Sequence, residues 1–316
     1  MHNVILYIWN KLPKIFLIPF LPLTIIFFII IFIRKYCFTK IIPRYSASNK
    51  IIVIGNIFVC GSGKTPFTIW LSNYLCDKEK QIAIISSGYG SQAKEATIIT
   101  HESKADKVGD EALVLKKSTS AEIVSSDNRI KSTKYIDSRN LDYIIHDDGL
   151  QHYKMNRDYE FIVTKFNKYH NNFLLPCGPF REPKSFHSQD KYIYSNYIKN
   201  DLPGFYTKLS KIRNGSNNKY FYLKDEIFKS SYLLTAIADS SDLIKELHNN
   251  NLNIETKIYP DHYNFTLKDI PNTTKPILVT EKDFTKLKEY NLKNIYILEQ
   301  SVFPNDKLIK MIEKLI

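Results

Sequence analysis

With 316 residues and a hydrophobic share of 44%, the chain can bury the cores of about two domains, which excludes an intrinsically disordered protein. Its 44 Lys and Arg residues exceed its 32 Asp and Glu residues and give a net charge of +12, but they are scattered, and no RNA-binding or helix-turn-helix signature accompanies them. We therefore expect anionic lipid headgroups or a phosphorylated substrate, and no nucleic acid, at the basic surface. The cysteines indicate a reducing cytosolic setting, because no metal-binding spacing links Cys37, Cys60, Cys76 and Cys177.

The first predicted element is an uncharged apolar segment at residues 15–33. As one helix it would be about 28 Å long, which is nearly the thickness of a bilayer core. Pro19 and Pro22 are expected to interrupt its first part and to leave only residues 23–33 unbroken, so both a spanning and an interfacial anchor are open. A basic pair follows directly, without the small-residue cleavage site of a secretion signal. We predict that residues 1–45 form a membrane anchor and that the remaining chain is cytoplasmic.

A glycine-rich segment after the next apolar run has the features of a phosphate-binding loop. Residues 51–54 predict a strand and residues 66–75 a helix, and the expected nucleotide contacts between them are Gly61, Ser62, Gly63, Lys64, Thr65 and Pro66. Backbone N–H groups in such a loop point at phosphate oxygens, Lys64 reaches the terminal phosphates, and Thr65 offers its hydroxyl to Mg²⁺. Phe58 stands where the usual pattern has a glycine. A nucleoside triphosphate is the expected ligand.

Strands and helices alternate along the rest of the chain, which predicts an α/β fold with a parallel sheet. The first set comprises strands at 51–54, 82–86, 143–145 and 161–164 and a further helix at 111–116. The second comprises strands at 233–238, 256–259, 277–279 and 295–298 and a helix at 243–248. From this pattern we predict a P-loop NTPase-like domain at 46–190, a connecting segment at 191–223 and a second, smaller α/β lobe at 224–316.

Two pairs of acidic residues follow the expected phosphate loop. Asp147 and Asp148 end an apolar strand, an arrangement by which phosphate-loop enzymes hold magnesium, although a simple Asp-Gly turn is the structural alternative. Asp110 and Glu111 open a predicted helix, where capping and compensation of the helix dipole are the simpler explanation. The candidate ligands of Mg²⁺ are Thr65, Asp147, Asp148 and Glu111.

Three further segments have both a structural and a functional interpretation. A lone histidine such as His262 is more often a surface or packed residue than a catalyst. Residues 280–283 read Thr-Glu-Lys-Asp, in which the Thr and the Asp can cap a helix. This is not the guanine motif Asn-Lys-x-Asp, and residues 103–106, which have that spacing, precede the acidic strand, so ATP is favoured over GTP. Arg181, next to Glu182, is either a phosphate contact or part of a surface ion pair in a structured crossover.

Several short motifs occur together in one order along the chain. They are Gly55-Asn56 with Gly61-x-Gly63-Lys64-Thr65-Pro66, Gly88-Tyr89-Gly90, Gly109-Asp110-Glu111, Asp147-Asp148-Gly149-Leu150-Gln151-His152, Leu175-Pro176-x-Gly178-Pro179-x-Arg181-Glu182, Asp261-His262 and Thr280-Glu281-Lys282-Asp283. In this order they resemble the motifs of the tetraacyldisaccharide 4'-kinase family, the lipid A kinases. Their joint occurrence is far more specific than any one of them, and the missing early glycine is also a trait of the family.

The resemblance implies transfer of the ATP γ-phosphate, with Mg²⁺, to the 4'-hydroxyl of a tetraacylated glucosamine disaccharide 1-phosphate. It implies a location at the cytoplasmic face of the inner membrane, and no obligate protein partner is evident. It places the catalytic base at Asp110, assisted by His262, and neutralisation of phosphate charge at Lys64. The substrate contacts that it implies are His152, Arg181 and Glu182.

This chain departs from the family pattern at three places. Cys60 replaces a usual glycine, Ser87 replaces a usual arginine, and residues 236–239 lack the expected Gly and Asn-Pro. We expect these changes to affect the phosphate loop and one anionic contact more than the identity of the protein. The alternatives are a membrane-associated ATPase or GTPase switch, which would hydrolyse nucleotide without a lipid acceptor, and a non-catalytic membrane protein that retained nucleotide binding.

Overall fold

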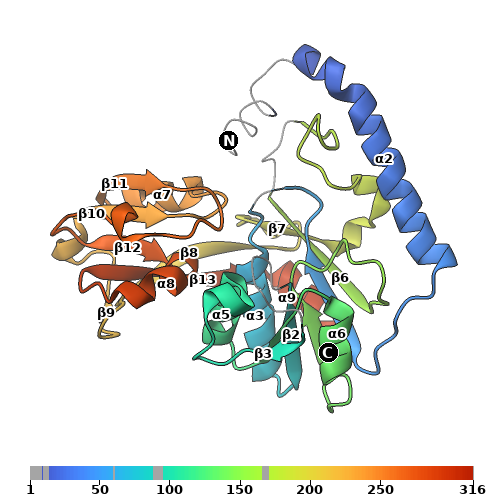
Figure 1. Ribbon diagram of the computed structural model, residues 1–316, viewed down its shortest axis with the longest axis horizontal. Coiled ribbons are helices and arrows are strands. Elements are labelled where there is room, and N and C mark those ends of the chain that lie inside the picture. The colour runs from blue at the N-terminus through green and yellow to red at the C-terminus, as the bar shows by residue number, and fades with distance from the viewer. Residues whose placement is uncertain (1–8, 10–13, 60, 88–94, 166–170, 316) are drawn as a thin grey trace.

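One sheet of 13 strands organises the computed structural model, which describes residues 9, 14–59, 61–87, 95–165 and 171–315. The strand order is β11-β10-β12-β13-β8-β7-β6-β1-β5-β2-β4-β3, and β9 pairs with β8 (Figure 1). Cys60 and the predicted Gly88-Tyr89-Gly90 motif lie outside the described residues. The sheet has a phosphate-loop half, β1 to β7, and a C-terminal half, β8 to β13.

The phosphate-loop half is the parallel sheet that the apolar runs predict. Its strands are β1 (Lys50–Gly55), β2 (Ile82–Ser86), β3 (Thr97–Ile98), β4 (Glu122–Ser125), β5 (Tyr143–His146), β6 (Tyr159–Lys165) and β7 (Tyr192–Ser195). Strand β1 lies between β5 and β6 and pairs in parallel with both, whereas β3 is antiparallel to β4. The predicted strands at 51–54, 82–86, 143–145 and 161–164 are confirmed.

Helices cover both faces of this half. They are α3 (Lys64–Asp77), α4 (Ala105–Val108), α5 (Asp110–Ser118), α6 (Arg129–Ile136) and α9 (Asp306–Glu313). Alternate residues of β1 face opposite sides, as the pleat of a strand requires. Ile52 and Ile54 pack in the same core as α3 and α5, whereas Ile51 and Val53 pack in the core that contains Ile136 of α6. The result is a doubly covered parallel sheet, typical of α/β proteins.

The C-terminal half continues the same sheet. Its strands are β8 (Gly204–Asn214), β9 (Tyr220–Phe221), β10 (Ser230–Thr235), β11 (Asn253–Ile258), β12 (Ile277–Thr280) and β13 (Ile295–Pro304), and its α-helices are α7 (Ser241–Asn249) and α8 (Glu281–Leu287). Strands β10 to β13 pair in parallel, and β13 pairs antiparallel with β8. Short helical turns complete the fold at η3 (Lys184–Phe186), η4 (Gln189–Lys191), η5 (Glu226–Phe228), η6 (Leu267–Asp269) and η7 (Lys288–Tyr290).

Residues 191–223, which we expected to connect two domains, carry strands β7, β8 and β9. Strand β8 pairs with β7 on one side and with β13 on the other, so the hydrogen-bonded sheet runs from one half into the other. The division of the chain at residues 190 and 224 stays a prediction.

The N-terminal apolar segment forms a longer helix than we expected. The turn η1 (Lys14–Phe20), helix α2 (Leu21–Tyr36) and the π-helical turn η2 (Cys37–Ile41) follow one another, and the helical run Ile15–Ile41 is long and apolar enough to cross a membrane. The α-helix begins at Leu21, two residues earlier than expected, because Pro22 lies in its first turn, where no N–H donor is needed, whereas Pro19 lies in the preceding 3-10 turn. Helix α2 runs along the outside of the phosphate-loop half (Figure 1).

Candidate active site

The phosphate loop lies at the C-terminal end of β1 and leads into α3, as the sequence pattern predicts. Gly63 precedes the helix with a φ of 87°, and a Cβ there would lie 3.2 Å from the Cβ of Ser195, so both backbone and packing require glycine. The Nδ2 atom of Asn56 donates to Ser62 Oγ at 3.3 Å. The described part of the loop therefore has the strand, turn and helix N-terminus that phosphate binding needs.

A cavity of about 1300 Å³ opens beside this loop and is lined by both halves of the sheet. The phosphate-loop half contributes the loop itself together with Ser87, Glu111, Asp148 and Arg181, and the C-terminal half contributes Ala238, Asp261, His262 and Lys282. All six predicted nucleotide contacts, Gly61, Ser62, Gly63, Lys64, Thr65 and Pro66, line this cavity. A volume of this size accommodates a nucleotide together with part of a second substrate.

The candidate metal ligands gather at one end of the loop. Asp147 is buried, and its Oδ1 accepts a hydrogen bond from Thr68 Oγ1 at 2.8 Å. Burial and the neighbouring carboxylates of Glu111 and Asp148 raise the pKa of Asp147 to about 6. Asp147 itself does not line the cavity, whereas Asp148, Glu111 and Thr65 do.

Asp148 is the carboxylate closest to the loop lysine. Its Oδ1 lies 3.3 Å from Lys64 Nζ, and its backbone adopts a φ of 51°. Burial opposes ionisation, but Lys64, Arg181 and Arg129 outweigh it and lower the pKa of Asp148. Arg129 is itself buried and donates to the Asp148 carbonyl at 2.9 Å, which holds this strand end in place.

These residues fit a magnesium ion of the kind that phosphate-loop enzymes use. Among the described residues no group of three or more His, Cys, Asp or Glu side chains can hold a metal on its own. Mg²⁺ bound with a nucleotide takes only one or two protein oxygens and completes its octahedron with phosphate oxygens and water. The raised pKa of Asp147 supports the fit, because a dication would relieve the repulsion among these carboxylates.

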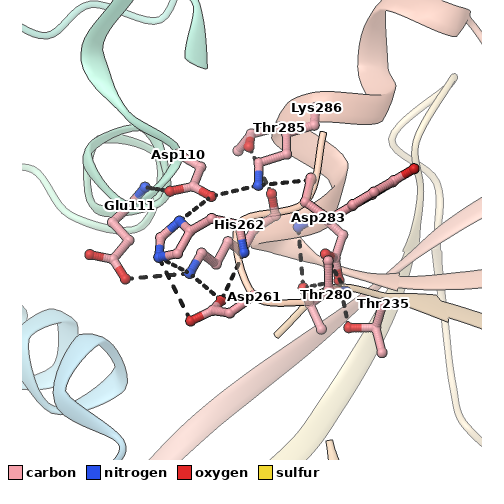
Figure 2. Close-up of polar contacts among 12 residues, drawn as sticks. Asp110, Glu111, Thr235, Asp261, His262, Thr280, Asp283, Thr285 and Lys286 are labelled. Carbon is pink, nitrogen blue, oxygen red and sulfur yellow. Dashed lines mark hydrogen bonds and ion pairs between the residues drawn. The ribbon is translucent and has the colours of Figure 1, made fainter. Parts of the chain in front are cut away.

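Asp110 lies in the first turn of α5 and meets the C-terminal half of the sheet. Its Oδ2 is 3.1 Å from Nδ1 of His262 and 2.8 Å from Nζ of Lys286, and Figure 2 shows the three side chains converging. Burial opposes ionisation of this carboxyl, but the contacts with His262, Lys282 and Lys286 hold its pKa well below its usual range. The structure thus joins the two residues that we predicted to act together, which are 152 positions apart.

Lys282 fixes the orientation of the His262 ring from the other side. Its Nζ is 3.3 Å from His262 Nε2, 3.1 Å from Asp261 Oδ1 and 3.4 Å from Glu111 Oε1. An ammonium group can only donate, so Nε2 accepts this hydrogen bond and Nδ1 carries the proton that His262 donates to Asp110. The three carboxylates around it outweigh burial and raise the pKa of Lys282.

Sequence reasoning missed Lys282 and Lys286 as site residues. It treated residues 280–283 as a helix cap, and that prediction is confirmed, because Thr280 accepts from the Asp283 amide. Asp283 is buried and also accepts from Thr235 Oγ1 at 2.7 Å, so it is structural. The signal that was available is the spacing of the two lysines, four residues apart on one face of α8.

The three predicted substrate contacts lie in different surroundings. Arg181 lines the main cavity, and its amide donates to the Ile57 carbonyl at 2.7 Å, beside the phosphate loop. Glu182 is 1% exposed, does not line that cavity and pairs with His187 at 2.8 Å. His152 lines a separate hollow of about 380 Å³. Arg181 is thus the only one of these three residues that lines the main cavity.

Comparison with known proteins identifies the family of the chain. Residues 16–316 match the family model of LpxK, tetraacyldisaccharide-1-P 4'-kinase. The chain belongs to this kinase family. The tetraacyldisaccharide 4'-kinase of Wigglesworthia glossinidia brevipalpis is 34% identical over 99% of this chain and 89% of that protein, and that of Aliarcobacter butzleri is 36% identical over 92% and 89%.

The fold of the kinase is also that of a solved relative. The crystal structure of the "apo" form of LpxK from Aquifex aeolicus in complex with ATP matches it with a TM-score of 0.77 and 25% sequence identity, over 95% of this chain and 99% of that one. The predicted family and the P-loop NTPase-like α/β fold are thereby confirmed. The kinase therefore does not belong to a family of GTPase switches.

Proposed function

We propose that the kinase transfers the γ-phosphate of ATP to the 4'-hydroxyl of tetraacyldisaccharide 1-phosphate. The observation that carries this proposal is the Asp110–His262 pair, with 3.1 Å between Oδ2 and Nδ1: His262 lines the cavity that the phosphate loop lines, and Asp110 lies buried directly behind it. In the reaction the 4'-oxygen forms a bond to the γ-phosphorus, the bond from that phosphorus to the bridging oxygen of ADP breaks, and the hydroxyl proton passes to Asp110. The products are ADP and the 4'-phosphorylated lipid A precursor.

Asp110 acts as the base in this scheme, and His262 positions it. A carboxylate with a lowered pKa is a weak base toward a sugar hydroxyl in the ground state. Phosphoryl transfer has a loose transition state, however, so Asp110 orients the hydroxyl first and accepts its proton late. The Nδ1–H of His262 and the Lys286 ammonium hold the carboxylate in one place, which lowers the entropy lost on reaching that state.

Lys64 and the carboxylates near it bind the other substrate. Lys64 lines the cavity, where it would reach the terminal phosphates bound by the loop amides and neutralise charge on the group being transferred. The residues that would hold Mg²⁺ are one or two of Thr65, Asp148, Asp147 and Glu111, and the ion would there stabilise negative charge on the phosphates. Arg181 is the remaining cationic contact from this half.

The membrane supplies the acceptor. Large apolar side chains of α2 face outward, among them Ile26 at 54% and Ile30 at 57% exposure. We infer that this surface inserts into the cytoplasmic face of the inner membrane and brings the cavity to the lipid headgroups. The acyl chains then stay in the bilayer, which avoids a cost of about 0.8 kcal/mol for each CH₂ group that would be exposed to water. The proposal requires no partner protein.

Transfer of labelled γ-phosphate in detergent micelles tests the proposal, with and without tetraacyldisaccharide 1-phosphate, for the wild type and for Asp110→Ala. We expect a phosphorylated lipid from the wild type and a loss of about 10²- to 10⁴-fold in Asp110→Ala, the usual range for a general base. Glu226→Ala, which removes an exposed acid of the C-terminal half, is the control and should match the wild type. Phosphate release that is independent of acceptor would instead identify an ATPase. If neither transfer nor hydrolysis occurred, the protein would be one that only binds nucleotide.

A further inference from the structure

A second group of ion pairs joins the two halves of the sheet and lines the same cavity as Asp110's partner His262. Lys165 is the last residue of β6, next to the phosphate-loop strand β1. Its Nζ lies 3.2 Å from Oδ2 of Asp239, two residues before α7, and 2.7 Å from Oδ2 of Asp242, in the first turn of α7 in the C-terminal half. Asn196, just after β7, donates to the same Asp242 oxygen at 2.6 Å.

The Lys165–Asp239 contact is shielded and oriented. Both side chains are largely covered, at 14% and 15% exposure, whereas Asp242 is 48% exposed. The other oxygen of Asp239 accepts from the amide of Ser241 at 3.2 Å and from its hydroxyl at 2.6 Å. These two hydrogen bonds hold the Asp239 carboxylate in place, so the ion pair with Lys165 forms with little loss of side-chain conformational entropy. An ion pair with these properties is worth more than an ordinary surface pair.

Asp239 belongs to the segment that departs from the family pattern, residues 236–239. This segment touches the phosphate loop, because a Cβ at Gly61 would lie 3.7 Å from the Cβ of Ala238. The departure therefore places a carboxylate one residue from the contact with the loop, and Lys165 supplies the matching cation from the other half. The two halves are joined at this point independently of Asp110 and His262.

We propose that Lys165 is a positioning residue that holds the 236–239 segment against the phosphate loop through Asp239 and Asp242, and so favours the closed cavity in which ATP binds. When only a closed form is competent to bind, the apparent dissociation constant equals the intrinsic constant divided by the fraction of molecules that are closed. Weakening the cluster should therefore reduce the affinity for ATP and leave the chemical step at saturating ATP unchanged. The inference rests only on the nucleotide-binding part of the proposed function.

Calorimetric titration with Mg-ATP, without lipid acceptor, tests this on the full chain. Lys165→Met should raise the dissociation constant about three- to tenfold, the range expected for one partly shielded charge-assisted contact. Lys165→Arg should stay close to the wild type, because a cation remains within reach of both carboxylates. Lys229→Met, which removes an exposed ion pair of the C-terminal half, is the matched control and should also bind like the wild type.

A double-mutant cycle separates this role from a general loss of stability. Asp239→Asn should add little to Lys165→Met, since both changes break the same contact, and kcat at saturating ATP should stay within about twofold of the wild type for all variants. Wild-type affinity in Lys165→Met would overturn the proposal, as would fully additive effects in the cycle. If Lys165→Met does not fold, the ATP affinities of Asp239→Asn and Lys165→Arg are compared instead, the first expected to be weakened and the second to match the wild type. Because no acceptor is present, these outcomes do not depend on which lipid is phosphorylated.

Discussion

The carboxyl group of Asp110 is under two opposing influences, and their balance sets its role. Burial favours the neutral acid, but His262 and two lysines of α8 favour the carboxylate and prevail. An ordinary exposed aspartate would be equally ionised at neutral pH, so the contribution of these contacts is to fix its position and not its charge. This is the arrangement that a late, positioned proton acceptor needs, whereas a residue that only caps α5 would need none of these partners.

Glu182 has the contacts of a structural residue. It is buried, and although burial opposes its ionisation, its hydrogen bond with His187 and the nearby Tyr153 hydroxyl lower its pKa. A lowered carboxyl pKa contributes stability above the pKa of the unfolded chain, about 4.3, and this contribution is lost as the pH falls through the folded value. We therefore predict that Glu182→Gln lowers the free energy of unfolding at pH 7 by about 1.5–3 kcal/mol and that the difference narrows below pH 4.

Urea unfolding of both proteins between pH 7 and pH 3.5 measures this. If the two free energies of unfolding differed by the same amount at every pH, ionisation of Glu182 would contribute nothing to stability. If Glu182→Gln left stability unchanged at pH 7 and instead abolished phosphate transfer, Glu182 would be a substrate contact, as the family resemblance implies.

At the scale of elements, helix α2 is attached to the segment that carries Arg181. Lys35 Nζ donates to the Phe186 carbonyl at 2.7 Å, and the Cys177 amide donates to Thr24 Oγ1 at 3.3 Å. The same segment pairs with the phosphate loop, since the Val59 amide donates to the Pro179 carbonyl at 2.8 Å. Helix α2 is thus held directly against this segment, and in the proposed membrane-bound state its position would fix the orientation of the cavity.

Charged residues on the outer face of α2 should therefore separate lipid access from nucleotide binding. We predict that Ile26→Glu combined with Ile30→Glu releases the kinase from anionic vesicles, because each charge costs about 2.5–3.5 kcal/mol at bilayer depth. Phosphorylation of vesicle-bound acceptor should fall by at least about a hundredfold, while the affinity for Mg-ATP should not change. Ile198→Glu is the control, since Ile198 is 78% exposed but lies outside α2. Vesicle sedimentation and calorimetry measure the two quantities, and retained vesicle binding would contradict the prediction.

Local sequence patterns predicted the elements whose formation depends on nearby residues. The strand before the phosphate loop is a continuous apolar run, and a glycine stands where the backbone requires a positive φ, so β1 and α3 follow from the sequence. Strand β8 was missed because its buried and exposed residues alternate irregularly, and partners from β7 and β13 decide its conformation. Lys286 was missed for the same reason, since its contact with Asp110 joins segments that only the tertiary fold brings together.

At the scale of the whole molecule, the sheet places its two halves around one cavity. The phosphate-loop half holds the residues expected to bind the nucleotide, and it also carries Asp110. The C-terminal half supplies His262 and Lys286, which contact Asp110, Lys282, which contacts His262, and the start of α7, which contacts Lys165. Neither half contains a complete site, so the proposed catalytic pair exists only when the halves are together.

The most direct test of this account is a double-mutant cycle on kcat for lipid phosphorylation, with Asp110→Asn, His262→Ala and the two combined, at saturating Mg-ATP. If His262 acts through Asp110, His262→Ala should lower kcat about ten- to a hundredfold, as expected for one hydrogen bond to a charged group, and the double variant should be no slower than Asp110→Asn alone. Calorimetric affinity for Mg-ATP should be unchanged in all three. Additive losses in the double variant, or an Asp110→Asn enzyme that phosphorylates the lipid at the wild-type rate, would contradict a catalytic pair assembled across the two halves.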